Sequence, residues 1–160
     1  MPRSETDLIA EVSGRVVELS QSLVTGGFFK EGDVLLRIDP LDYEIALEQA
    51  SAQVQRAVSE LATARKNYER QRNLSRRQST SESLEDDARN RLQIAEAAQR
   101  EAKARLAIAE RDLERTVVKA PYDGRVRTEQ VDLGQFLNRG SRLAKPVSYT
   151  HLTLPTNSAV

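Results

Sequence analysis

The residues that could carry out chemistry are few, and their spacing does not form a catalytic or metal-binding pattern. Asp86 and Asp87 are adjacent carboxylates, but acidic residues are also favoured in the first turn of a helix. Arg76 and Arg77 are adjacent cations of the kind favoured at a helix C-terminus. The chain has no cysteine, a single histidine, and no phosphate-binding or nucleophile motif. We therefore expect no catalytic residue, no metal and no cofactor, and hence no enzymatic activity.

Two similar segments suggest that the elements around them are duplicated. "GGFFKEG" occupies residues 26–32 and "GQFLNRG" occupies residues 134–140. Each follows a Gly-Arg-Val and precedes a leucine, Leu35 in the first copy and Leu143 in the second. Alternating apolar residues broken by glycine predict short strands with turns. A few short strands cannot bury a core alone, so the two segments are expected to be halves of one small β-domain.

The matched spacing also predicts which residues form the core and the turns of this β-domain. Turn positions are expected at glycines, and for Gly32 and Gly140 we expect positive φ angles. The expected structural turns are Gly14, Gly26, Gly32, Gly124, Gly134 and Gly140. The expected core consists of Val16, Phe28, Leu35 and Ile38 packed against Val118, Val126, Phe136 and Leu143.

Between the two halves, residues 41–116 contain neither glycine nor proline and carry a heptad pattern. Seam positions separated by alternating fours and threes predict two long helices in a coiled coil. The first seam is Tyr43, Leu47, Ala50, Val54, Ala57, Leu61, Ala64 and Tyr68. The second seam is Ala88, Leu92, Ala95, Gln99, Ala102, Leu106, Ala109 and Leu113. The polar residues 76–83 predict a loop with Ser81 or Ser83 as N-cap, and hence an antiparallel hairpin; one continuous dimerising helix is the alternative.

The sequence thus predicts an α+β fold, in which a long antiparallel helical hairpin is inserted into a split β-domain. The expected segments are residues 6–39, 40–116 and 117–145, for the first β half, the hairpin and the second β half. Residues 146–160 contain no charge and resemble the translation of a sequencing-library adaptor, so we interpret them as a non-native tail. His151 lies in this tail and receives no role.

Bulk composition excludes some classes of partner. The 24 basic residues balance the 24 acidic residues, which gives no electrostatic reason to expect binding to nucleic acid or to an anionic membrane. No apolar run reaches the ~20 residues of a membrane helix. Residues 1–9 lack the apolar segment of a signal peptide.

The two β halves resemble the biotinyl/lipoyl carrier fold, in which a lysine at the tip of a central hairpin carries the cofactor. Here the helical hairpin occupies the link between the halves. Lys30, Lys119 and Lys145 lie outside the hairpin, and none has the flanking residues of a carrier tip. A carrier domain therefore remains the less favoured alternative.

The whole of residues 9–145 resembles a known family. "VSGRVVEL", "GGFFKEGDVLLRIDPLDYEIALEQA" and "VVKAPYDGRV" followed by "DLGQ" are similar to segments of periplasmic adaptor subunits of tripartite efflux pumps. These are the membrane fusion proteins, or HlyD-like family, and the chain looks most like the adaptors of resistance-nodulation-division (RND) transporters.

The resemblance implies a periplasmic adaptor that is anchored to the inner membrane and assembled in a ring, commonly a hexamer. It implies partners at both membranes, an inner-membrane RND transporter and an outer-membrane TolC-like channel, and a role in exporting small molecules. An adaptor of an ABC exporter or of a type I secretion system is the alternative. Family adaptors often carry a channel-docking motif, Arg-x3-Leu-x6-Ser, and Arg70, Leu74 and Ser81 match its spacing. Because Leu74 and Arg70 are four residues apart and off the seam, both are expected to point outward.

Overall fold

The structure is a computed structural model that describes residues 6–77 and 82–148. It contains a β unit, made of the residues up to Leu41 and from Asp112 onward, and a hairpin unit, Asp42–Arg111. The two helices of the hairpin are α1 (Leu41–Arg76) and α2 (Glu82–Arg115). The strands of the β unit are β1 (Leu8–Ile9), β2 (Gly14–Leu19), β3 (Phe28–Phe29), β4 (Val34–Ile38), β5 (Val117–Lys119), β6 (Gly124–Glu129), β7 (Phe136–Leu137) and β8 (Arg142–Ser148).

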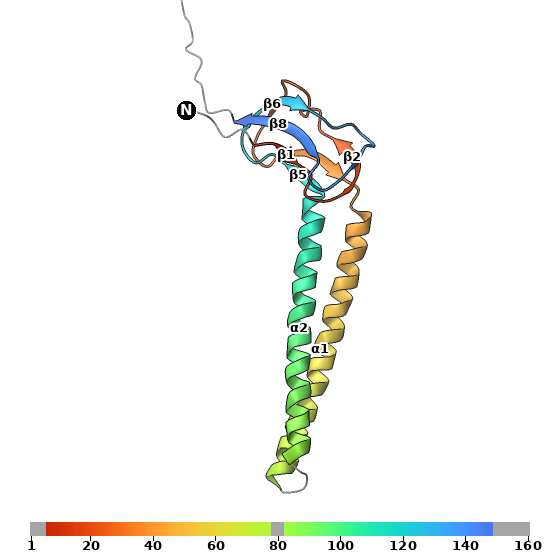
Figure 1. Cartoon of the computed structure of the whole chain (residues 1–160), viewed down its shortest axis with the longest axis vertical. Helices are drawn as coiled ribbons and strands as arrows, with labels where there is room; N and C mark the ends of the chain where they lie inside the picture. Colours follow the sequence, from red (N-terminus) through yellow and green to blue (C-terminus); the bar gives the residue numbers. More distant parts are fainter. Residues whose placement is uncertain (1–5, 78–81, 149–160) are drawn as a thin grey trace, which may run out of the picture. The chain divides into compact units, whose positions relative to one another are not determined.

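The β unit, whose strands are drawn as arrows in Figure 1, consists of two four-stranded antiparallel sheets that have the same internal order. One sheet has the order β1-β8-β6-β3, and the other has the order β5-β4-β2-β7. Strands β1, β2, β3 and β4 of the first half correspond in this order to β5, β6, β7 and β8 of the second half. Exchanging each strand for its counterpart converts the order of one sheet into the order of the other. Each sheet therefore takes two strands from each half, which is why neither half can close its own core.

Hydrogen bonds between the halves repeat the same symmetry. The Gly26 amide donates to the Val126 carbonyl at 2.8 Å, and the Gly134 amide donates to the Val16 carbonyl at 2.9 Å. The Gly32 and Gly140 amides likewise donate to alanine carbonyls, those of Ala120 and Ala10. The two similar sequence segments thus belong to two halves of one fold, and each half contributes strands to both sheets.

The shared core is confirmed except at its two phenylalanines. Phe28 and Phe136 are 64% and 59% exposed, whereas their neighbours Phe29 and Leu137 are 4% and 1% exposed. The predicted inward positions of Phe28 and Phe136 are therefore wrong. The remaining six predicted core residues are buried: Val16, Leu35, Ile38, Val118, Val126 and Leu143.

The glycines have two different roles. Gly32 and Gly140 have φ angles of 85° and 89°, as expected, with space around them. Gly26 and Gly134 also have positive φ angles. Gly14 and Gly124, in contrast, are the first residues of β2 and β6 and do not lie in turns. Close contacts with neighbouring strands require glycine at both positions.

A Cβ on Gly124 would lie 2.3 Å from the Val147 carbonyl oxygen and 3.0 Å from the Phe29 ring. A Cβ on Gly14 would lie 2.3 Å from Ile38 Cγ2. Glycine within a strand often marks such a close approach. These two positions let a neighbouring side chain lie directly over the backbone of β2 or β6.

The hairpin unit confirms the heptad seams. Helices α1 and α2 run side by side in opposite directions (Figure 1), so the alternative of one continuous helix is wrong. Every predicted seam residue is buried or half-buried, and Ala50, Ala57, Leu61, Ala88, Ala102 and Ala109 are the most buried residues of the hairpin. Ser83 lies inside α2 and so does not precede the helix as an N-cap, while Ser81 lies outside the described residues.

Strand β8 extends into the segment interpreted as a non-native tail. Pro146 is fully buried and pairs with Val126, at the position of the second half that corresponds to Ile38 in the first. Its carbonyl accepts a hydrogen bond from the Tyr122 hydroxyl at 3.1 Å. The fold therefore continues through Ser148 as the sequence stands, whereas residues 149–160 lie outside the described residues.

Candidate functional site

The last turns of α1 contain two of the three residues of the docking motif. Arg70 is exposed, as expected, but Leu74 is half-buried and does not point freely outward. Gln71 and Ser75, the next seam positions, are also half-buried, so Leu74 shares the edge of the interface between the helices with them. Ser81 lies outside the described residues, and the structure does not test its proximity to the other two.

A groove lies beside Arg70, which the sequence analysis did not identify. It has a volume of about 660 Å³ and lies between α1 and Arg91 of α2. Short polar side chains at intervals of four residues, Ser59, Thr63 and Asn67, leave room along α1. This four-residue repeat of short polar side chains is the signal that could have predicted the groove.

The groove is rich in cationic side chains. Lys66 and Arg70 line it from α1, and Arg91 lines it from α2. Glu60 is its only acidic lining residue and already pairs with Arg56 at 2.9 Å. The arrangement favours an acidic or carbonyl-rich segment of a partner, to which arginines can donate several hydrogen bonds.

Next to the groove, the seam changes from apolar to polar. The guanidinium carbon of Arg89 lies 5.9 Å from the centroid of the Tyr68 ring, and hydrogen bonding to Tyr68 raises the pKa of Arg89. One heptad position further, the Gln71 side-chain oxygen Oε1 is buried without a hydrogen-bond partner among the described residues. An unsatisfied buried oxygen is destabilising, so the end of the seam is weaker than the part before Tyr68.

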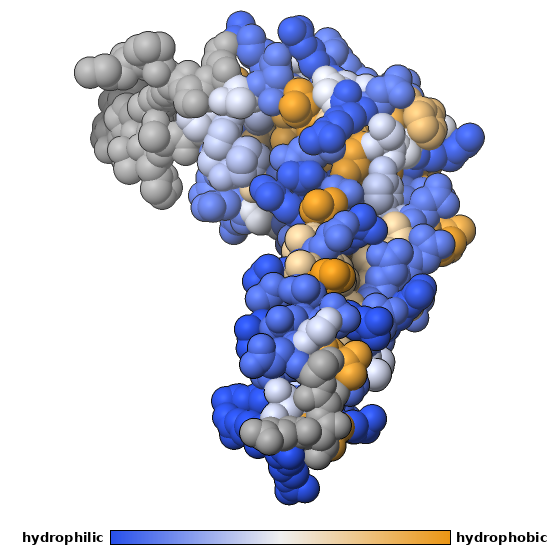
Figure 2. Space-filling model, turned by 60° about the horizontal axis from the view of Figure 1, so that its bottom comes forward, coloured by the Kyte–Doolittle hydropathy of each residue, from blue (hydrophilic) through white to orange (hydrophobic). Residues whose placement is uncertain are grey.

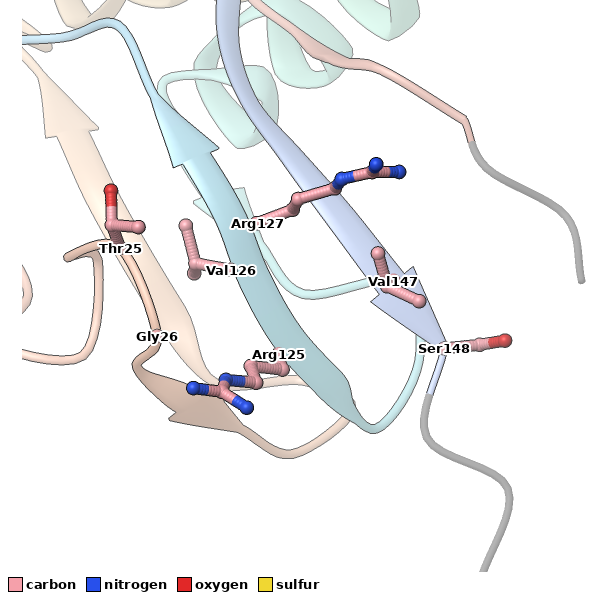
Figure 3. A pocket seen from close by; sticks show the side chains of 7 residues that line it. All are labelled: Thr25, Gly26, Arg125, Val126, Arg127, Val147 and Ser148. Atoms are coloured by element: carbon pink, nitrogen blue, oxygen red, sulfur yellow. The ribbon is translucent and has the colours of Figure 1, made fainter.

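A second hollow lies in the β unit, with a volume of about 440 Å³. Its walls are the segment before β3, the strand β6 and the end of β8 (Figure 3). Arg125 and Arg127 extend from β6 on either side of Val126, and Thr25 and Gly26 face them from the segment before β3 (Figure 3). The wall from β8 consists of Val147 and Ser148, which belong to the tail segment.

The described residues offer neither a metal site nor a membrane span. No group of three or more His, Cys, Asp or Glu side chains lies close enough to hold an ion within residues 6–77 and 82–148. No helix in the same ranges is long and apolar enough to cross a membrane. Hydrophilic residues cover most of the face drawn in Figure 2, with hydrophobic residues among them. The exposed large hydrophobic residues of the hairpin unit are Ile45, Val58, Leu84, Ile94 and Ile108.

Comparison with known proteins defines the class of protein. Residues 4–147 match the family model "RND MFP, barrel-sandwich hybrid domain", in which MFP stands for membrane fusion protein. The chain belongs to this family of periplasmic adaptor proteins, as its sequence motifs indicated.

Individual relatives are similar over most of the chain. It is 32% identical over 139 residues to the uncharacterized protein YdhJ of Escherichia coli K12, covering 87% of this chain and 48% of YdhJ. Among solved structures, it is 25% identical to a putative efflux transporter from Bacteroides eggerthii, with a TM-score of 0.70 and coverage of 91% and 40%. It is also 25% identical to ZneB from Cupriavidus metallidurans, with a TM-score of 0.62 and coverage of 89% and 60%. The chain thus spans about half the length of the relatives that it matches.

Proposed function

We propose that this chain is part of a periplasmic adaptor that links an inner-membrane RND transporter to an outer-membrane TolC-like channel. In this role it supports the export of small molecules and catalyses no reaction. The observation that carries the proposal is the insertion of two antiparallel helices of 36 and 34 residues between the halves of a β unit. At 1.5 Å per residue the hairpin spans about 50 Å, a length suited to bridging two proteins.

The remaining parts of the proposal concern assembly and location. We propose that the full-length protein lies in the periplasm, is anchored to the inner membrane, and forms a ring, with six copies as the expected number. The hairpin has a counterpart among relatives, since one solved structure similar to this chain is a MacA-MexA chimeric protein that contains the α-hairpin domain of MexA from Pseudomonas aeruginosa. That chimera is 29% identical to this chain, with a TM-score of 0.54 and coverage of 91% of this chain and 48% of the chimera.

In the proposed mechanism, the channel contacts the end of the hairpin where α1 finishes. Arg70 is exposed beside the cationic groove and can donate to carbonyl or carboxylate oxygens of the channel. Leu74 is half-buried and contributes its exposed edge to the contact. Ser81 is proposed as the third contact because its spacing fits the family motif.

Drug susceptibility of cells tests the proposal. A strain that lacks the full-length gene should become sensitive to exported compounds and regain resistance when the gene is restored. Arg70→Asp and Leu74→Ser should each fail to restore it, although the purified proteins keep their helical circular dichroism. Arg72→Asp is the matched control, because it makes the same charge change on α1 but residues two apart do not share a helix face. Full resistance with both Arg70→Asp and Leu74→Ser, at normal expression, would exclude this end of the hairpin from the mechanism.

A further inference from the structure

The hairpin loses its apolar seam before α1 ends. Up to Tyr68 the seam positions of α1 are alanine, leucine, valine or tyrosine, and all are buried or half-buried. The next two seam positions are Gln71 and Ser75, and none of residues 69–77 is fully buried. On the facing helix, residues 82–87 are likewise exposed or half-buried. Because burial of apolar side chains is the main force that holds two helices together, this end of the hairpin is held weakly.

Polar groups are covered at this end instead of apolar ones. The Gln71 side-chain oxygen Oε1 is buried and has no hydrogen-bond partner within residues 6–77 and 82–148. On α2 the Glu85 side chain is only 19% exposed, and its ion pair with Arg89 is 3.7 Å long, too long for a hydrogen bond. Separation of the helices would return both groups to water, which lowers the free energy needed to open this end.

The weak end begins at the same level on both helices. On α1 the last seam residue before the polar positions is Tyr68, and the guanidinium carbon of Arg89 on α2 lies 5.9 Å from the centroid of its ring. On α2, Ala88 is 2% exposed, whereas none of residues 82–87 is buried. We call residues 69–76 of α1 and 82–87 of α2 the polar end of the hairpin.

Leu74 lies in the polar end and is half-buried there. Residues 82–87 offer it no buried apolar side chain, because Leu84, their only large apolar residue, is 50% exposed. Separation of the helices therefore removes little apolar contact from Leu74 and makes its whole side chain accessible. This matters because a contact with a partner protein requires an accessible leucine, whereas the closed hairpin covers part of it.

We propose that the polar end opens as one unit, and that the opening exposes Leu74 and Gln71 to the outer-membrane channel. The docking step of this inference rests on the proposed function. Leu74 supplies an apolar contact, and Gln71 Oε1 accepts a hydrogen bond from an N–H or hydroxyl group of the channel. The channel binds the open form, so it shifts the hairpin from the closed form to the open one.

Native-state hydrogen exchange of the purified 160-residue chain, followed amide by amide by NMR, tests the opening. Separated turns lose their helical hydrogen bonds, because short helices are unstable alone in water. The amides of residues 72–76 and 86–89 should therefore be protected at least about 10-fold less than those of residues 57–67. Gln71→Leu should raise the protection of both sets by the same factor, at least about 5-fold, because a single opening exposes them.

Two further variants separate opening from other effects of the substitution. Ser75→Leu fills the other polar seam position and leaves Gln71 in place, so it should also raise the protection of both sets. Gln99→Leu is the matched control, because it makes the same change at a half-buried seam position in the middle of α2. It should leave the exchange of the polar end unchanged, since the polar end opens without the middle of the hairpin.

Drug susceptibility of cells tests the docking step. Gln71→Leu and Ser75→Leu in the full-length protein stabilise the closed form and should both lower resistance, although they do not destabilise the protein. Gln99→Leu should support full resistance. The binding-competent fraction sets the apparent affinity for the channel, so a 5-fold smaller open fraction weakens docking about 5-fold.

Three outcomes would overturn the inference. The first is a polar end whose amides are as protected as those of residues 57–67. The second is a Gln71→Leu variant that changes the exchange of α1 alone, which would indicate fraying of one helix instead of opening of a unit. The third is full resistance with both Gln71→Leu and Ser75→Leu at normal expression.

These experiments separate the inference from the proposed function. Hydrogen exchange uses the purified chain and neither transporter nor channel. If the unsubstituted full-length gene does not restore resistance, the proposed function is refuted, and with it the docking step, whereas exchange still decides whether the polar end opens. If the unsubstituted gene restores resistance but the polar end exchanges like the middle of the hairpin, the inference alone is refuted.

Discussion

Strands β3 and β7 test the core that the two halves share, because each has one buried and one exposed residue. Phe29 is 4% exposed and Phe28 is 64% exposed, although they are adjacent phenylalanines on β3. Removing a buried phenylalanine side chain costs about 3–5 kcal/mol, whereas a surface substitution stays within about 0.5 kcal/mol. Phe29→Ala should therefore lower the melting temperature by about 6–12 °C or more, since 1 kcal/mol shifts it by roughly 2–4 °C in a chain of this size.

The second half provides the matched pair. Leu137→Ala should cost about 2–5 kcal/mol, while Phe136→Ala should cost almost nothing, although phenylalanine is the larger side chain. Differential scanning calorimetry measures the melting temperature, and hydrogen exchange of the β6 amides reports the stability of the β unit separately from the hairpin. A cost for Phe28→Ala equal to that of Phe29→Ala would refute the assignment of inner and outer faces, and a silent Leu137→Ala would refute the shared core.

Three further predictions concern the turns, the seam and its polar end. Gly32→Ala and Gly140→Ala should each lower the free energy of unfolding, measured in urea, by about 1–2 kcal/mol. The reason is that both φ angles are positive, although the surrounding space is open. Stability equal to that of the unsubstituted chain would show that the positive φ angles do not require glycine. Leu61→Ala should lower the free energy of unfolding by about 2–5 kcal/mol, measured by thermal unfolding followed by circular dichroism at 222 nm, whereas Ile94→Ala should have almost no effect because Ile94 is exposed. Equal effects of the two changes would contradict the assignment of Leu61 to the buried seam. Gln71→Leu should raise the free energy of unfolding of the hairpin by about 1–3 kcal/mol, because it removes a buried oxygen that has no hydrogen-bond partner within residues 6–77 and 82–148. A loss of stability would show that the oxygen is satisfied in solution.

The sequence by itself determined the hairpin and the duplication. A heptad pattern fixes which face of each helix is buried, and Ala50, Leu61 and Ala102 are buried as that pattern predicts. The absence of glycine and proline from residues 41–116 marks an uninterrupted helical region on either side of a polar loop. The positive φ angles of Gly32 and Gly140 also follow from local sequence, because turn chemistry involves only neighbouring residues.

The end of α1 could be predicted only in part. The exposure of Arg70 follows from its helix position, but the half-burial of Leu74 depends on how α1 packs against α2 beyond Tyr68. The groove beside Arg70 likewise requires Arg91, which reaches it from the other helix. The heptad pattern of one helix does not predict which residues of the other helix lie beside it.

Only the tertiary structure decided which phenylalanine enters the core. A strand of two residues is too short for alternation to show its inner face, and both residues of β3 are phenylalanine. The choice comes from the pairing of Phe29 with Gly124 on a strand from the other half, where the missing side chain leaves room for the ring. Pairing between the halves likewise places Leu137, opposite Gly14, rather than Phe136 inside.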